Sequence, residues 1–192
     1  MQQSQSKSVI LVLGGVRSGK SRYAQKLAER ANAVTFIATA ERRDDAEMRA
    51  KIERHRADRP AHWTTVEEPL RLASAIKQAG SMGDVVLVDC LTIFAANLLE
   101  AAQSDQGVQQ ASIEDLCDAL HGASGTVLLV SNEVGSGVVP AYASGRRYRD
   151  LVGEINQRVA TIADTVLLLV AGLPLVLKGV LPHGTVTDRE TP

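Results

Sequence analysis

Residues 14–21, Gly-Gly-Val-Arg-Ser-Gly-Lys-Ser, have the composition and spacing of a loop that binds a nucleoside triphosphate. They fit G-x-x-x-x-G-K-[ST], in which glycines let successive backbone N–H groups point at phosphate oxygens. In such a loop the lysine, Lys20, is expected to reach the β- and γ-phosphates, and the hydroxyl of Ser21 to ligate Mg²⁺. We therefore predict a catalytic role for Lys20 and nucleotide contacts from the whole loop: Gly14, Gly15, Val16, Arg17, Ser18, Gly19, Lys20 and Ser21. For Arg17 two interpretations stay open, a phosphate ligand and a solvated side chain.

A carboxylate at the end of a later strand should complete the metal site, because Mg²⁺ prefers oxygen ligands. Asp89 directly follows the apolar run Val85–Val88 and is the first candidate. Its alternative interpretation is a strand-end cap. Glu133, which follows the run 128–132, is the second candidate.

A histidine surrounded by arginines lies in the segment 44–63. His55 has Arg54 and Arg56 beside it, and Arg59 follows one helical turn later. An imidazole among guanidinium groups suits attack on a phosphate, since the arginines neutralise the charge that builds on the oxygens. The same pattern also fits a solvated helix face, so the residues alone leave the role of His55 open.

The elements that position these residues alternate between strands and helices. Strands are predicted at 9–13, 34–38, 85–89, 126–130 and 165–170, with a short edge strand at 175–177. The longer runs are apolar at nearly every position, which is typical of strands covered on both faces. The sequence therefore predicts an α/β fold of the P-loop NTPase class, a mostly parallel sheet flanked by helices.

Helical patterns fill the intervals between the predicted strands. Helices are predicted at 19–31, 43–57, 69–79, 91–101, 112–121 and 144–163. The first would place its N-terminal dipole behind the bound anion. Ser112 followed by Asp115 indicates a capping box at the start of the fifth helix, and the polar run 102–110 is predicted to be a surface loop.

Composition excludes several functional classes. The formal net charge of −1 gives no reason to expect nucleic acid as a partner. The longest apolar stretch, 166–176, contains Gly172 and Pro174 and has about half of the ~20 residues that a membrane span needs. The first residues lack the apolar stretch of a secretory signal, so we expect a cytoplasmic protein.

Chain length indicates the number of domains, and cysteine usage indicates the redox state of the compartment. The 192 residues suit one catalytic domain over 1–182 with a flexible tail at 183–192. Cys90 and Cys117 are far apart in the sequence, and we predict that both are reduced and structural.

Six stretches, in order along the chain, resemble one enzyme family: 11–24, 36–63, 85–92, 130–140, 146–160 and 170–179. They include H-R-x-D-R at 55–59, S-N-E-V-G at 131–135 and R-D-L-x-G-x-x-N-Q at 149–157. Combined with the P-loop, these motifs resemble the bifunctional adenosylcobinamide kinase / adenosylcobinamide-phosphate guanylyltransferase family of cobalamin (vitamin B12) biosynthesis.

The resemblance implies a RecA-like P-loop fold, a homotrimer and two reactions. In the first reaction, ATP or GTP phosphorylates the hydroxyl on the aminopropanol arm of adenosylcobinamide. In the second, GTP guanylylates a histidine and releases pyrophosphate, and the GMP then passes to adenosylcobinamide phosphate to give adenosylcobinamide-GDP.

The family's catalytic histidine corresponds to His55. The resemblance therefore favours guanylylation of His55 over a solvated helix face. Besides the P-loop, the resemblance implies nucleotide contacts from Thr39, Ala40, Glu41, Arg56, Ala57, Asp58, Arg59, Glu67 and Asp89. One stretch departs from the family pattern: residues 136–142 read Ser-Gly-Val-Val-Pro-Ala-Tyr where the family tends to have M-G-I-V-P-E-N. A contact that the family's Glu-Asn pair makes with the corrinoid or a neighbouring subunit would be altered at Ala141 and Tyr142.

Two other hypotheses use fewer of these features. A small-molecule kinase of another pathway would need only the loop and a metal, and would leave His55 without a role. A GTP-dependent regulatory switch would bind and slowly hydrolyse GTP, but the sequence has no N-K-x-D type motif for guanine. Covalent nucleotide on His55 would separate the bifunctional enzyme from both.

Overall fold

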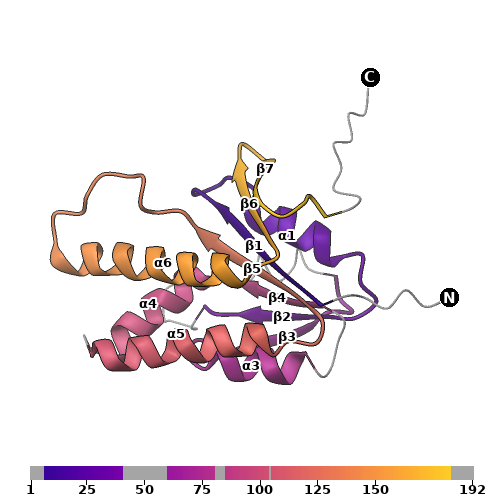
Figure 1. Cartoon of the computed structure of the whole chain (residues 1–192), viewed down its shortest axis with the longest axis horizontal. Coiled ribbons are helices and arrows are strands. Elements are labelled where there is room, and N and C mark those ends of the chain that lie inside the picture. Colours follow the sequence, from indigo (N-terminus) through magenta and orange to yellow (C-terminus); the bar gives the residue numbers. More distant parts are fainter. Residues whose placement is uncertain (1–6, 41–59, 81–84, 104, 183–192) are drawn as a thin grey trace.

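A seven-stranded sheet forms the centre of the molecule in the computed structural model, which describes residues 7–40, 60–80, 85–103 and 105–182 (Figure 1). The strand order is β3-β2-β4-β5-β1-β6-β7. All neighbouring strands pair in parallel except β6 and β7, which are antiparallel. The strands are β1 (Ser8–Gly14), β2 (Val34–Ala38), β3 (Thr64–Glu67), β4 (Val85–Asp89), β5 (Thr126–Asn132), β6 (Thr165–Val170) and β7 (Leu173–Lys178).

Helices cover both faces of this sheet, as Figure 1 shows: α1 lies on one face and α3, α4, α5 and α6 lie on the other. Their bounds are α1 (Lys20–Ala28), α3 (Leu72–Ala79), α4 (Leu91–Ala101), α5 (Gln106–His121) and α6 (Ala143–Ile162). Side chains of β1 alternate between the two buried clusters. Leu11 and Leu13 belong to the cluster under α3–α6, whereas Ile10 and Val12 belong to the cluster under α1. Burial on both faces is the physical reason for the continuous apolar runs in the sequence.

The predicted sheet is confirmed, with differences at its edges. The strands predicted at 34–38, 85–89 and 165–170 have those bounds, and β1 and β5 are somewhat longer than predicted. The short edge strand at 175–177 is confirmed and extends over Leu173–Lys178. Strand β3 was not predicted, because Thr64-Thr-Val-Glu67 is mostly exposed at the opposite edge of the sheet and carries no apolar run.

The prediction of a surface loop at 102–110 is wrong over most of that range, because α5 already begins at Gln106. The carboxylate of Asp105 caps the helix by accepting hydrogen bonds from the N–H groups of Gly107 (2.8 Å) and Val108 (3.3 Å). The predicted capping box at Ser112 is also wrong, since the Ser112 hydroxyl lies within the helix and donates to the carbonyl oxygen of Val108. The first turns of α5 are solvent-exposed, so no apolar periodicity marks them in the sequence.

Some predictions fall outside the described residues. These are the helix at 43–57 and the tail at 183–192. In the part of the chain that the structure describes, no helix combines the length and apolar character that crossing a bilayer requires.

Candidate functional site

The phosphate-binding motif forms a tight turn between β1 and α1. Gly19 has a φ of 91°, which L-residues with a side chain adopt only with strain. Gly14 is held even more closely: a Cβ there would lie 2.3 Å from Ser18 Oγ and 2.8 Å from the carbonyl oxygen of Leu169. Two of the motif's glycines are therefore required by the geometry of the loop itself.

The loop is fixed to the sheet at both of its ends. Gly172 donates its N–H to the carbonyl oxygen of Ser18 (2.9 Å), and Glu133 donates its N–H to that of Gly14 (3.2 Å). These bonds join the turn after β6 and the segment after β5 to the phosphate loop. A loop held in this way is preorganised, so less conformational entropy is lost when an anion binds.

Lys20 and Ser21 occupy the first turn of α1, as the motif predicts. The ammonium group of Lys20 donates to the carbonyl oxygen of Gly15 (3.1 Å) and so folds back over the loop. The α1 N-terminus contains no acidic residue in its first turn, so its partial positive charge is not offset there. The arrangement favours a polyphosphate at this point.

The candidates on other strands lie at the same edge of the sheet. Strand register places Glu67, Ala38 and Asp89 in one row across β3, β2 and β4. Strand β5 separates β4 from β1, so Asp89 lies two strand spacings, about 10 Å, from the strand that carries the loop. Ligands of open α/β sheets bind at this carboxyl edge.

Thr39 joins the ends of β2 and β4. Its hydroxyl donates to the carbonyl oxygen of Cys90 (2.8 Å) and accepts from the N–H of Cys90 (2.9 Å). The side-chain amide of Asn97 donates to the carbonyl oxygen of Thr39 (2.8 Å). The Thr39 residue is 0% exposed. Its nucleotide contact stays a prediction, while the contacts in the structure make it a positioning residue for Ala40 and Asp89.

Cys90 follows Asp89 and is not set up as a nucleophile. Burial, and secondly the carboxylate of Asp89, raise the pKa of this thiol above its ordinary value of 9.0. Burial likewise raises the pKa of Tyr148, whose hydroxyl donates to the carbonyl oxygen of Thr92 (3.3 Å). Both cysteines are free, as predicted, and a protonated Cys90 fits a structural role.

Glu133, the second carboxylate candidate, lies closer to the loop along the sheet than Asp89 does. It follows β5, the direct neighbour of β1, and its backbone contacts Gly14. Its carboxylate accepts the N–H of Gly135 (2.9 Å) and is exposed.

Oxygen donors available at this edge fit Mg²⁺. The half-buried Ser21 hydroxyl and Asp89 carboxylate are hard ligands, and a magnesium ion in a nucleotide site takes its remaining ligands from phosphates and water. Within the described ranges no three His, Cys, Asp or Glu side chains come together as a dedicated metal cage. A shared protein–phosphate site is the arrangement that these donors support.

Several predicted residues cannot be placed relative to this site. His55, Glu41, Arg56, Asp58 and Arg59 lie outside the described residues, as does Ala57. Arg17 is exposed and has a φ of 58°. The structure therefore brings together the loop, Thr39, Ala40, Glu67 and Asp89 at one sheet edge, and leaves the histidine segment as a sequence-based prediction.

A group of residues beside the loop was given no role from the sequence. The hydroxyl of Thr92 accepts the N–H of Asn132 (2.9 Å), and the side-chain amide of Asn156 donates to the carbonyl oxygen of Asn132 (3.0 Å). These bonds fix the end of β5 next to Gly14. Asn156 belongs to the R-D-L-x-G-x-x-N-Q motif, and that motif is the sequence feature that could have identified it as a site residue.

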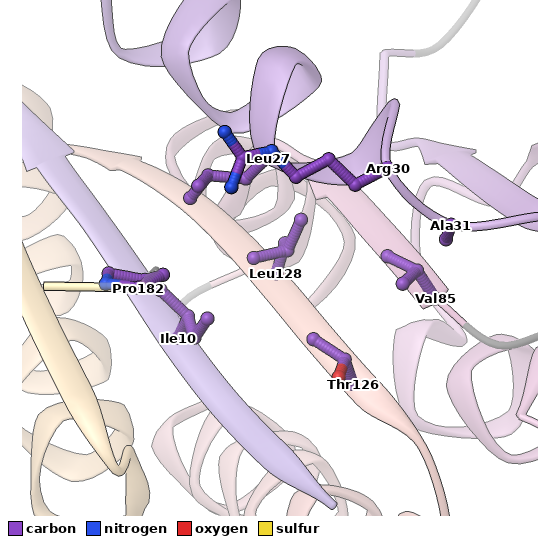
Figure 2. Close-up of a pocket in the computed structure, with 8 residues that line it drawn as sticks. All are labelled: Ile10, Leu27, Arg30, Ala31, Val85, Thr126, Leu128 and Pro182. Carbon is purple, nitrogen blue, oxygen red and sulfur yellow. The ribbon is translucent and has the colours of Figure 1, made fainter. Parts of the chain in front are cut away.

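Two hollows lie near the sheet. The pocket in Figure 2 has a volume of about 190 Å³ and is lined by Leu27, Arg30 and the amino-terminal part of the sheet, away from the phosphate loop. A larger hollow of about 720 Å³ lies between α6 and the sheet. It is lined by Leu13 of β1, Glu133 after β5, Arg149, Gly153 and Asn156 of α6, and Leu177 of β7, among others. We call it the α6 cavity.

The chain is similar in sequence to bifunctional enzymes of adenosylcobalamin biosynthesis. Bifunctional adenosylcobalamin biosynthesis protein CobP of Pseudomonas aeruginosa is 47% identical over 172 residues, covering 88% of this chain and 96% of that protein. The CobU proteins of Escherichia coli and Salmonella typhimurium, which carry the same description, are 40% identical over 181 residues, covering 88% of this chain and 99% of theirs.

The fold also resembles that of a solved structure. An ATPase from a type III secretion system superimposes with a TM-score of 0.56 at 13% identity, over 85% of this chain and 51% of the ATPase chain. At that identity the likeness concerns the fold alone, and it agrees with the P-loop α/β class. Residues 10–177 match the family described as cobinamide kinase / cobinamide phosphate guanyltransferase, and the chain therefore belongs to that family.

Proposed function

We propose that the protein catalyses both reactions of its family on the corrinoid substrate of the cobalamin pathway. It phosphorylates adenosylcobinamide with ATP or GTP, and it then transfers GMP from GTP to adenosylcobinamide phosphate. The observation that carries the proposal is the phosphate loop, which joins Lys20 and the α1 N-terminus to a sheet edge lined by Asp89 and Glu67. Family membership favours this function over a kinase of another pathway and over a GTP switch.

In the kinase step the substrate hydroxyl oxygen attacks the γ-phosphorus. An O–P bond forms, the bond from the γ-phosphorus to the bridging oxygen breaks, and the nucleoside diphosphate leaves while the hydroxyl proton is released. Lys20 and the backbone N–H groups of the loop would stabilise the charge on the phosphate oxygens. Ser21 and Asp89 would hold Mg²⁺, which when bound supplies further neutralisation of that charge.

In the transferase step a ring nitrogen of His55 attacks the α-phosphorus of GTP. An N–P bond forms and pyrophosphate leaves; a phosphate oxygen of adenosylcobinamide phosphate then attacks the same phosphorus and releases the imidazole. Covalent catalysis of this kind divides one transfer into two displacements. Thr39, Ala40, Glu41, Arg56, Ala57, Asp58, Arg59, Glu67 and Asp89 are the proposed additional nucleotide contacts.

Labelling with α-³²P-GTP and Mg²⁺ tests the transferase step. We expect a covalent GMP adduct that is labile in acid and stable in alkali, as a phosphoramidate is. The His55→Ala variant should carry no label, while His62→Ala, which changes an exposed histidine after the arginine segment, should be labelled like the wild type. An unlabelled wild-type protein would exclude the covalent mechanism.

Substitution of Lys20 tests the shared phosphate site. Lys20→Ala should remove both activities, because both reactions place a triphosphate in the same loop. The far-ultraviolet circular dichroism should match the wild type, since Lys20 is not part of either core cluster. Full residual turnover in a folded variant would contradict the assignment of the loop.

We also propose that residues 1–182 form one catalytic domain that assembles as a cytoplasmic homotrimer. The apolar β7 edge supports assembly: Leu173 is 71% exposed and Leu175 is 56% exposed in the isolated chain. The other edge strand, β3, is polar by contrast. An exposed apolar edge strand favours aggregation unless another chain covers it.

The proposed cytoplasmic location is supported by the cysteines, because two free thiols agree with a reducing compartment.

A further inference from the structure

Two residues that line the α6 cavity each have a buried side-chain atom without a hydrogen-bond partner among the described residues. These are Oδ1 of Asn156 and Nη1 of Arg149. Asn156 is only 6% exposed, and its Nδ2 is already bound to the carbonyl oxygen of Asn132. Buried polar groups without partners are rare and costly in native proteins, so a ligand that satisfies them would gain affinity.

The two atoms have complementary requirements. Asn156 Oδ1 is an acceptor that needs an N–H donor, whereas Arg149 Nη1 is a donor that needs an acceptor. They lie seven residues apart on α6, about two helical turns, and both residues line the same cavity. Carboxamide groups supply an N–H donor and a carbonyl acceptor, and so match both requirements.

Gly153 lies between Arg149 and Asn156 on the same stripe of α6. A Cβ at Gly153 would meet no atom within 4 Å, and its φ is not in the left-handed region. Neither packing nor backbone conformation therefore requires glycine there, although glycine in a helix costs about 1 kcal/mol relative to alanine. The space left open at Gly153 faces the cavity that this residue lines.

Charges around the cavity do not favour an anion. The cations Arg149 and Lys178 are accompanied by the carboxylates of Glu133, Asp150 and Glu154. Lys178 is further engaged with the α6 C-terminus, where its ammonium donates to the carbonyl oxygens of Ala160 (3.0 Å) and Thr161 (2.9 Å). The surroundings suit a neutral, amide-bearing ligand better than a phosphate.

We propose that the α6 cavity binds the carboxamide-bearing edge of the corrinoid substrate, with Gly153 leaving room for it and Arg149 and Asn156 bonding its amides. The inference rests on the proposed function, because it names where the second substrate of that function lies. Cobinamide carries several carboxamide arms around an apolar ring, and the cavity also presents the apolar residues Leu13 and Leu177. A hollow of about 720 Å³ is within the usual range for a small-molecule site and accepts part of so large a molecule.

The position of the cavity allows the bound substrate to reach the nucleotide. Leu13 immediately precedes Gly14, and Glu133 lines the cavity while its N–H binds the Gly14 carbonyl. The side chain of Leu13 belongs to the core cluster on the α6 face, and α1 lies on the opposite face. A corrinoid held beside α6 would therefore approach the phosphate loop across the carboxyl edge of the sheet.

Direct binding of cobinamide tests this assignment without relying on turnover. Equilibrium dialysis in the absence of nucleotide, followed by the visible absorbance of the corrin, gives the dissociation constant for the full chain. Gly153→Leu should weaken binding at least about tenfold, because its side chain occupies the cavity. Ala111→Leu, at an exposed position of α5 outside the cavity, is the matched control and should bind as the wild type does.

A second variant separates loss of binding from misfolding. Gly153→Ala should raise the melting temperature, since alanine is the better helix former, while still weakening cobinamide binding. In kinase assays both Gly153 variants should raise the KM for cobinamide and leave the KM for ATP unchanged. A stabilised variant with wild-type cobinamide affinity would overturn the proposal, as would a raised KM for the nucleotide alone.

The two proposals fail in different ways. A wild-type protein that binds cobinamide, loses that binding in Gly153→Leu, and yet phosphorylates nothing would refute the proposed function and support the cavity. A protein that phosphorylates cobinamide while Gly153→Leu binds it normally would refute the cavity alone. Absence of cobinamide binding by the wild type would refute the cavity directly.

Discussion

At the scale of single residues, the glycines of the phosphate loop differ in what they do. Gly14 has no space for a side chain, since a Cβ would contact Ser18 and the backbone of Leu169. A Cβ at Gly15 would meet nothing within 4 Å. The first glycine is therefore required by the fold of the loop, and the second is available for contact with a ligand.

This difference predicts unequal losses of stability for two alanine substitutions. Gly14→Ala should lower the free energy of unfolding by about 1–3 kcal/mol, because the carbonyl oxygen of Leu169 is held in the sheet and cannot move aside. Gly15→Ala should change it by less than about 0.5 kcal/mol. Urea unfolding of the two variants and the wild type measures both values, and equal stabilities for the two variants would contradict the geometry.

At the scale of elements, α5 shows how a helix can begin where its sequence gives little sign of it. Its first turns are polar and exposed, and the apolar stripe that packs on the core starts only at Ile113. The helix begins at Gln106 because Asp105 satisfies two otherwise unpaired N–H groups. A capping residue with its hydrogen bonds thus determines the boundary, and hydrophobic periodicity does not.

Removal of the cap should destabilise the protein. We expect Asp105→Ala to lower the free energy of unfolding by about 1 kcal/mol, and Asp105→Asn to retain most of the stability because asparagine also caps well. Ser112→Ala serves as the control, since Ser112 lies inside the helix and its hydroxyl only bonds back to Val108. A melting temperature lowered more by Ser112→Ala than by Asp105→Ala would instead support the capping box that the sequence predicts at Ser112.

At the scale of the whole molecule, the two sheet edges have different surfaces. The β3 edge exposes Thr64, Thr65 and Glu67, whereas the β7 edge exposes Leu173 and Leu175. An apolar edge of this kind is the surface that we expect a second and third copy to cover in the proposed homotrimer.

Charge placed on that edge should prevent assembly. Wild-type protein should have a mass in light scattering three times the 20.5 kDa of one chain, and the double variant Leu173→Lys/Leu175→Lys should have the mass of a single chain. Thr64→Lys/Thr65→Lys places the same charges on the opposite edge and should leave the mass unchanged. If the double variant Leu173→Lys/Leu175→Lys is still a trimer, β7 is not the interface.

The sequence by itself determined the phosphate loop, the strands under it and the class of the fold. The residues that identify the loop are eight consecutive positions between a strand and a helix, and burial on both faces marks the strands as continuous apolar runs. The exposed strand β3 and the first turns of α5 escaped prediction because neither has an apolar periodicity to detect.

Only the tertiary structure decided which distant residues meet. The strand order β5-β1-β6-β7 places α6 and β7 beside Leu13 and Glu133, and so forms a cavity from residues as far apart as 13 and 178. The R-D-L-x-G-x-x-N-Q motif shows a conspicuous pattern in the sequence, but its unpaired amide oxygen and the open space at Gly153 depend on packing between elements far apart in the chain. Local motifs encode local geometry, whereas a cavity is set by long-range packing that no short window of residues contains.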